Sequence, residues 1–149
     1  TYLSGSRHSH LDSAGYALDQ ELLSQGKTLS AREMAQRLLR EEARRQILSS
    51  LVVCFFARNL YDGETISAAL RTMGMEFAPE DLEKLGMEIL RRKFAFKVRE
   101  GFSLEKLQIP RRALETPTPF GQLSVEFLRE ALREMEKILR GEDGVEGAS

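Results

Sequence analysis

Three side chains in this sequence have the chemistry that catalysis or metal binding most often uses: Cys54, His8 and His10. Cys54 is the only cysteine, so the chain can form no internal disulfide. One thiolate also cannot complete a zinc or iron–sulfur site. Because Cys54 stands inside the apolar run 51–57 (LVVCFFA), it is typical of a small hydrophobic core residue. If it binds a metal instead, its partner ligands must lie outside this chain.

The two histidines stand close together near the start of the chain, in the order His8, His10, Asp12. On an extended segment, side chains two positions apart point to the same side. Such a pair can bind a metal, transfer protons or hydrogen-bond a ligand oxygen. The alternative is a solvated loop before the first helix, and the residue pattern by itself leaves both interpretations open.

Other charged groups and motifs give weaker evidence of a functional site than Cys54 and the two histidines. Basic residues gather between positions 91 and 99, with Glu83, Glu88 and Glu100 on either side of them along the chain, which favours a solvated helix face over an anion site. The sequence contains no phosphate loop, no G-x-S-x-G and no C-x-x-C motif. No complete active site is therefore recognisable within this chain.

Composition excludes several classes of protein. The 149 residues carry 22 Lys plus Arg and 23 Asp plus Glu, a net charge of -1, which argues against a nucleic-acid binder with a large positive field. The longest apolar run, 51–57, is far shorter than the about 20 residues of a membrane-spanning helix. The start shows no apolar signal segment, so we expect a cytoplasmic protein, and a first residue of Thr1 suggests a piece of a longer one.

The element that carries Cys54 is predicted to be a long central helix. Ser30 and Glu33 form the S-x-x-E capping box that begins a helix. The stretch 40–46 (REEARRQ) is strongly polar and is expected to be solvated or half-buried, whereas 47–56 is apolar around the whole circumference, as in a buried helix. We expect the helix to end near residues 59–61, with Cys54 buried in it. A β-strand over LVVCFF is the alternative.

The rest of the chain is predicted to complete an all-α fold. Helical periodicity or end signals indicate further helices over 11–23, 63–73, 79–98 and 123–139, and Pro110, Pro117 and Pro119 indicate an extended strap over 102–121. We therefore expect an irregular bundle of four to five helices with a long Pro-containing strap. Residues 1–140 are predicted to form one domain and 141–149 a disordered tail.

Three stretches, in this order, resemble the aldehyde:ferredoxin oxidoreductase family. Residues 5–20 (GSRHSHLDSAGYALDQ) are similar to its G-R-H-x-H-x-D-x-A-G-Y segment, and residues 47–58 (ILSSLVVCFFAR) to its late cysteine motif. Residues 93–112 (KFAFKVREGFSLEKLQIPRR) resemble its F-N-x-R-E-G-F segment and the L-P-x-R turn that follows. The resemblance extends over nearly the whole chain, from about residue 4 to residue 139.

Members of this family are tungsten enzymes that oxidise aldehydes to carboxylic acids. Two pterin dithiolenes hold the metal, beside a 4Fe-4S cluster that passes electrons to ferredoxin. The β-rich pterin-binding domain and the C-x-x-C-x-x-x-C cluster motif have no counterpart here, so the resemblance implies only the last helical domain. The implied partners are the remainder of the enzyme (β domain and middle helical domain), ferredoxin and a small aldehyde, with tungsten or molybdenum as the metal.

The resemblance also implies roles for single residues. Cys54 matches the fourth cluster ligand of the family. The family pattern before it is often D-x-x-G-L-C, and here Ser49 replaces the Asp while Val52 and Val53 replace the Gly-Leu pair, which implies pterin contact at these three positions. His8 or His10 matches a histidine near the tungsten, where an imidazole can donate a hydrogen bond or move a proton.

The sequence thus favours an oxidoreductase fragment that supplies one cluster ligand and pocket residues, binds no cofactor by itself and is inactive in isolation. A non-catalytic helical protein-interaction module is the alternative, with Cys54 as a core residue and the histidines on a surface loop. A third interpretation is a separate subunit that completes a split enzyme.

Overall fold

The structure is a computed structural model that describes residues 14–119 and 121–142. In these residues the chain forms six α-helices and one 3-10 helix, and its only β pairing is an isolated bridge between Thr118 and Gly121. The α-helices are α1 (Ala14–Gln25), α2 (Ala31–Ser50), α3 (Gly63–Arg71), α4 (Pro79–Arg99), α5 (Arg111–Glu115) and α6 (Val125–Arg140), and the 3-10 helix is η1 (Phe55–Leu60). The predicted all-α class is confirmed.

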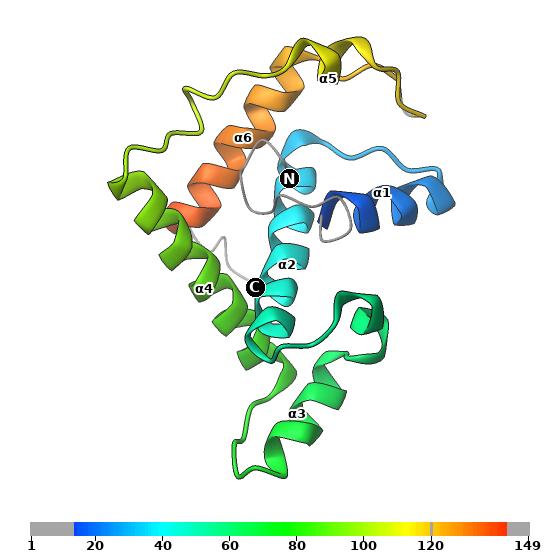
Figure 1. Cartoon of the computed structure of the whole chain (residues 1–149). Coiled ribbons are helices and arrows are strands. Elements are labelled where there is room, and N and C mark those ends of the chain that lie inside the picture. The colour runs from blue at the N-terminus through cyan, green and yellow to red at the C-terminus, as the bar shows by residue number, and fades with distance from the viewer. Residues whose placement is uncertain (1–13, 120, 143–149) are drawn as a thin grey trace, which may run out of the picture.

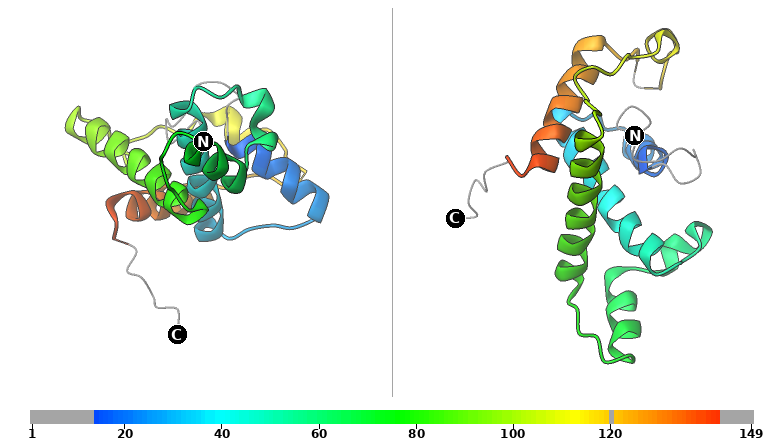
Figure 2. Two further views of the ribbon diagram at one scale, coloured as in Figure 1. Left: turned by 90° about the horizontal axis from the view of Figure 1, so that it is seen from below. Right: turned by 60° about the vertical axis from the view of Figure 1, so that its left-hand side comes forward.

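Helix α2 is the central element, and α1, α4 and α6 all pack against it (Figure 1). Helix α6 lies beside one end of α4 and α3 beside the other (Figure 2). The predicted capping box begins α2: the Ser30 hydroxyl accepts from the Glu33 N–H at 3.3 Å, and the Glu33 carboxylate accepts from the Ser30 N–H at 2.9 Å. These hydrogen bonds from Ser30 lower the pKa of the Glu33 carboxyl.

The sequence prediction for the other end of α2 is wrong. The helix ends at Ser50 and does not continue to residues 59–61. The Val53 N–H bonds back to the Leu48 carbonyl at 2.9 Å and the Val52 N–H to the Ser49 carbonyl at 3.1 Å, which is the Schellman pattern of helix termination. This pattern places Val52 in the left-handed region at φ +57, a conformation that a β-branched residue rarely adopts.

The polar stretch 40–46 also differs from expectation, because several of its side chains are buried. Glu42 is 1% exposed, Arg45 1% and Gln46 3%, since α1, α4 and α6 enclose the middle of α2. Each makes a polar contact: the Ala14 N–H donates to Glu42 at 3.4 Å, Arg45 donates to Glu41 at 2.8 Å, and Lys93 donates to Gln46 at 2.6 Å. Polar side chains can lie in this core because they are partnered.

The apolar core consists of three clusters along α2. The first joins α2, α4 and α6, the second joins the end of α2 with α3 and the start of α4, and the third joins α1 to the first half of α2. In the first cluster α2 and α4 approach closely at Gly86, where a Cβ would lie 2.3 Å from the Ala43 carbonyl oxygen. A glycine is therefore required at this helix crossing.

The Pro-containing segment between α4 and α6 is fixed by its own contacts. Leu104 is buried in the first cluster, and the Arg129 guanidinium of α6 donates to the Glu105 carbonyl at 2.7 Å and to the Leu107 carbonyl at 2.8 Å. The segment also contains the short helix α5. In the part of the chain that the structure describes, no helix has the length and apolar character needed to cross a membrane.

We expect Val52→Gly to stabilise the chain by about 0.5–1 kcal/mol, because releasing roughly 1–2 kcal/mol of left-handed strain outweighs the backbone entropy of glycine. The lost side chain is 91% exposed and contributes little packing. Urea unfolding followed by circular dichroism measures the change. Val125→Gly in the first turn of α6 is the control and should destabilise; a loss of stability in both variants would contradict the strain at Val52.

Candidate functional site

Cys54 lies in the connection between α2 and η1, and its side chain is exposed. The sequence predicted a buried thiol inside a helix, and that prediction is wrong. The reason is the early end of α2, which turns residues 51–54 away from the helix axis before Cys54 is reached. The sulfur is therefore open to an external partner, as a cluster ligand would need, and it does not fill the core.

The backbone around Cys54 is anchored on both sides. Val53 and Phe55 pack against the second core cluster, formed by Ile47, Leu48, Ile66, Leu70 and Leu82. The Cys54 carbonyl accepts from the Ala57 N–H at 2.9 Å, which begins η1. The packing of residues 53 and 55 thus holds the backbone next to the exposed thiol against the core.

Arginine side chains of α2 connect this loop to the helix. The Arg44 guanidinium donates to the Arg58 carbonyl at 2.7 Å and to the Tyr61 carbonyl at 3.3 Å. The buried Arg45 guanidinium lies 5.9 Å from the centre of the Phe55 ring, within cation–π range. Sequence reasoning missed both arginines, because the stretch 40–46 has the composition of a solvated face and shows no motif.

The loop that carries the thiol also exposes several large apolar side chains. Val52 is 91% exposed and Phe56 81%, and three further large apolar residues of the same loop are exposed: Leu51, Leu60 and Tyr61. A soluble chain gains nothing from a cluster of exposed apolar side chains in one loop, and such a surface is typical of a contact with another polypeptide. We call residues 51–61 the cysteine loop.

The predicted pterin-contact residues lie at the start of the cysteine loop. Ser49 and Val52 are exposed, and Val53 is half-buried against the core. The backbone N–H groups of Val52 and Val53 already donate within the chain. A ligand at this point would therefore meet the surface of Ser49 and the apolar side chain of Val52, and would find no free amide at those two positions.

The structure brings Ser49, Val52, Val53 and Cys54 together because they follow one another in the sequence. His8 and His10 lie outside the described residues, so their predicted role has no geometry here. Among residues 14–119 and 121–142 no group of three or more His, Cys, Asp or Glu side chains could hold a metal ion. Cys54 can act as one ligand of a site whose other ligands come from elsewhere.

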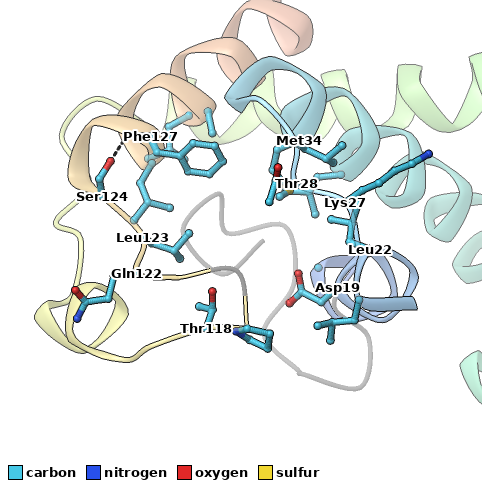
Figure 3. A pocket seen from close by; sticks show the side chains of 18 of the residues that line it. Asp19, Leu22, Lys27, Thr28, Met34, Thr118, Gln122, Leu123, Ser124 and Phe127 are labelled. Carbon is cyan, nitrogen blue, oxygen red and sulfur yellow. Dashed lines mark hydrogen bonds between the residues drawn. The ribbon is translucent and has the colours of Figure 1, made fainter. Parts of the chain in front are cut away.

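A pocket of about 510 Å³ lies at the other end of the molecule (Figure 3). Its walls come from α1, the α1–α2 connection, the first half of α2, the segment 118–124 and α6. They are largely apolar, as with Leu22, Leu123 and Phe127, while Asp19 brings a carboxylate to the wall. Sequence reasoning did not predict this pocket, since its walls come from five separate segments.

Comparisons with known proteins gave one match. The family model described as "Aldehyde ferredoxin oxidoreductase, domains 2 & 3" matches residues 1–140. No curated protein and no solved structure matched the chain. The matched span contains both histidines, the cysteine loop and the segment between α4 and α6.

Asp19 gives a pH-dependent prediction for the pocket. Partial burial raises the pKa of this carboxyl above 3.8, so its ionisation opposes folding. The cost is absent below pH 3.8, where the carboxyl is protonated in both states, and is complete above the raised pKa. Asp19→Asn should therefore raise the melting temperature at pH 7 and leave it unchanged at pH 3.

Thermal unfolding at both pH values measures this difference. Glu105→Gln, which removes an exposed carboxylate outside the pocket, serves as the control and should match the unmodified chain throughout. A gain for Asp19→Asn that persists unchanged at pH 3 would contradict the burial of the carboxylate as its cause.

Proposed function

Since the family model covers residues 1–140, the chain belongs to the aldehyde ferredoxin oxidoreductase family, and from this premise we propose that it is the C-terminal helical domain of a pterin-dependent aldehyde oxidoreductase. Residues 1–140 act as one domain, with 141–149 as its tail. The domain supplies one cluster ligand and residues at the pterin and the substrate. It is inactive without the rest of the enzyme.

The observation that carries this proposal is the exposed thiol of Cys54 on an anchored loop. A thiolate is the usual ligand of iron–sulfur clusters, and exposure leaves the sulfur open to a cluster held mainly by other polypeptide. A core cysteine would instead be sealed among apolar side chains. The donor chemistry and the exposure therefore fit one corner of a 4Fe-4S cluster.

The surface around the thiol supports a partner of this kind. The exposed apolar side chains of the cysteine loop would be covered by the pterin-binding β domain and the middle helical domain of the same enzyme. Burial there would exclude water from the cluster, which is one of the factors that set its potential. When bound, the cluster and the pterin-held tungsten or molybdenum supply electron transfer to ferredoxin and the oxidation of an aldehyde to a carboxylic acid.

This chain's own residues would contribute binding and proton handling. Ser49 would hydrogen-bond the pterin through its hydroxyl, and Val52 and Val53 would form an apolar edge beside it. His8 or His10 would hold the aldehyde oxygen or move a proton as water adds to the carbonyl carbon. The replacement of a family Asp by Ser49 removes a negative charge from this contact.

A helical protein-interaction module is the second candidate. The same exposed loop favours it, because an apolar surface of this kind suits any protein partner. The two functions differ in what Cys54 does: a cluster ligand must be a thiolate, whereas an interface residue of similar size would serve equally well.

Cys54→Ser in the full-length enzyme tests the ligand role. We expect loss of most of the 4Fe-4S signal in electron paramagnetic resonance and lower iron per chain, because a serine hydroxyl is a poor replacement for a thiolate. The fold of this domain should survive, since the side chains have similar size and the position is exposed. Asn59→Ser, in the same loop and also exposed, is the matched control. An unchanged cluster in Cys54→Ser would favour the interaction module.

His8→Asn and His10→Asn, made separately, test the substrate-pocket role. We expect one of them to lower kcat for aldehyde oxidation by about 10²–10⁴-fold, the usual contribution of general acid–base catalysis. Turnover is measured at equal metal, pterin and iron content, so that cofactor loss cannot imitate a catalytic defect. Full activity in both variants would rule out an active-site role for this histidine pair.

A further inference from the structure

We propose that Arg44 is a positioning residue for the Cys54 thiolate: its guanidinium binds the end of the cysteine loop and thereby fixes where the sulfur stands. The inference rests on the proposed function, since it takes Cys54 as a cluster ligand. It adds a residue that sequence reasoning had assigned to a solvated helix face.

The contacts of Arg44 reach across the base of the loop. One guanidinium nitrogen donates to the carbonyls of Arg58 and Tyr61, and the other lies 3.7 Å from the Glu41 carboxylate. Arg58 in turn donates to the Phe55 carbonyl at 2.8 Å. The chain of contacts therefore runs from α2 through Arg44 and Arg58 to the residue that follows Cys54.

The loop has few other means of holding its shape. Its outer side chains are exposed, so packing fixes only the part near Val53 and Phe55. The end of η1 has no buried residue. Without Arg44, the Arg58 and Tyr61 carbonyls would lose their link to α2, and the segment that closes the loop after Cys54 would be free to move.

A guanidinium suits this task because it is planar and carries several fixed N–H donors. It can hold two carbonyls while it remains beside Glu41. A lysine ammonium at the same place keeps the charge but has a smaller reach and no fixed fork. Arg44→Lys should therefore restore only part of what Arg44→Met removes.

Precise placement matters for a cluster ligand. A metal ligand whose supporting contacts are lost binds its metal less firmly, typically by about 10–100-fold. Three of the proposed four ligands come from other polypeptide, so Cys54 must arrive at a position that those three define. A loop held by Arg44 meets that requirement at a lower entropic cost than a mobile one.

The test has two readouts and one matched control. Amide hydrogen exchange on this chain follows the Ala57 N–H, which donates to the Cys54 carbonyl. The rate of iron loss to a chelator and the electron paramagnetic resonance spectrum follow the cluster in the full-length enzyme. Arg40→Met is the control, because Arg40 lies one turn earlier on α2 and makes an exposed ion pair with Glu83 at 3.0 Å, away from the cysteine loop.

For Arg44→Met we expect exchange at Ala57 to accelerate about tenfold while amides in the middle of α4 change little, as for a local opening. Iron loss should accelerate about tenfold as well, and the electron paramagnetic resonance spectrum should change. In both readouts, Arg44→Lys should lie between Arg44→Met and the unmodified protein. Arg40→Met should match the unmodified protein in both readouts.

The outcomes separate this inference from the proposed function. Unchanged exchange in Arg44→Met would overturn the positioning role and leave the Cys54 assignment intact. If Cys54→Ser removes the cluster, but Arg44→Met accelerates exchange at Ala57 and leaves the cluster unaltered, the positioning role is overturned too. If Cys54→Ser leaves the cluster unaltered, the proposed function fails, and the positioning role fails with it.

Discussion

The hydrogen bond from the Val53 N–H to the Leu48 carbonyl is the constraint on which the candidate site depends. It ends α2 one turn before the thiol and turns the chain outward. Had the helix continued, Cys54 would occupy another position on its surface, and Phe55 would lose its place against Arg45. The turn requires Val52 to take a left-handed conformation. Val52 stands at the glycine position of the family pattern D-x-x-G-L-C. Backbone strain of this kind is most often found at functional sites.

The protein combines this strained turn with two further features that do not favour stability in isolation. Charged and polar side chains lie buried in the middle of α2, where even partnered ions lose hydration. Large apolar side chains of the cysteine loop face outward. Both are consistent with a domain whose final stability comes from the polypeptide it contacts, because a partner that binds only the folded form stabilises it.

Helix α2 separates two regions with different properties. The pocket takes its lining from Met34 and Leu38 in the first half of the helix, while the cysteine loop follows its last residue. Twenty residues of α-helix span about 30 Å. The buried polar contacts of Glu42, Arg45 and Gln46 lie between these two regions, and through Lys93 they join α2 to α4. Polar contacts thus join the helices in the middle of the molecule, and the pocket and the cysteine loop lie toward the two ends of α2.

Local sequence signals determined much of this protein. The predicted capping box at Ser30 begins α2, and Pro79 stands at the start of α4, because each of these features depends on residues within one helical turn. The resemblance of three short stretches gave the family, which the match to residues 1–140 bears out. These inferences succeeded because caps and motifs are contiguous in the chain.

Only the tertiary structure decided which residues of α2 are buried and where the helix ends. Composition predicted a solvated or half-buried face over residues 40–46 and a buried helix over 47–56, yet Arg45 is fully buried and Val52 and Cys54 are exposed. Three neighbouring helices enclose the polar stretch and supply partners from distant positions, such as Lys93 for Gln46. Of the apolar stretch, Ile47 and Leu48 pack against residues of α3 and α4, whereas Val52 and Cys54, beyond the end of α2, are exposed. Burial depends on what surrounds a residue, and the sequence of one segment does not contain that information.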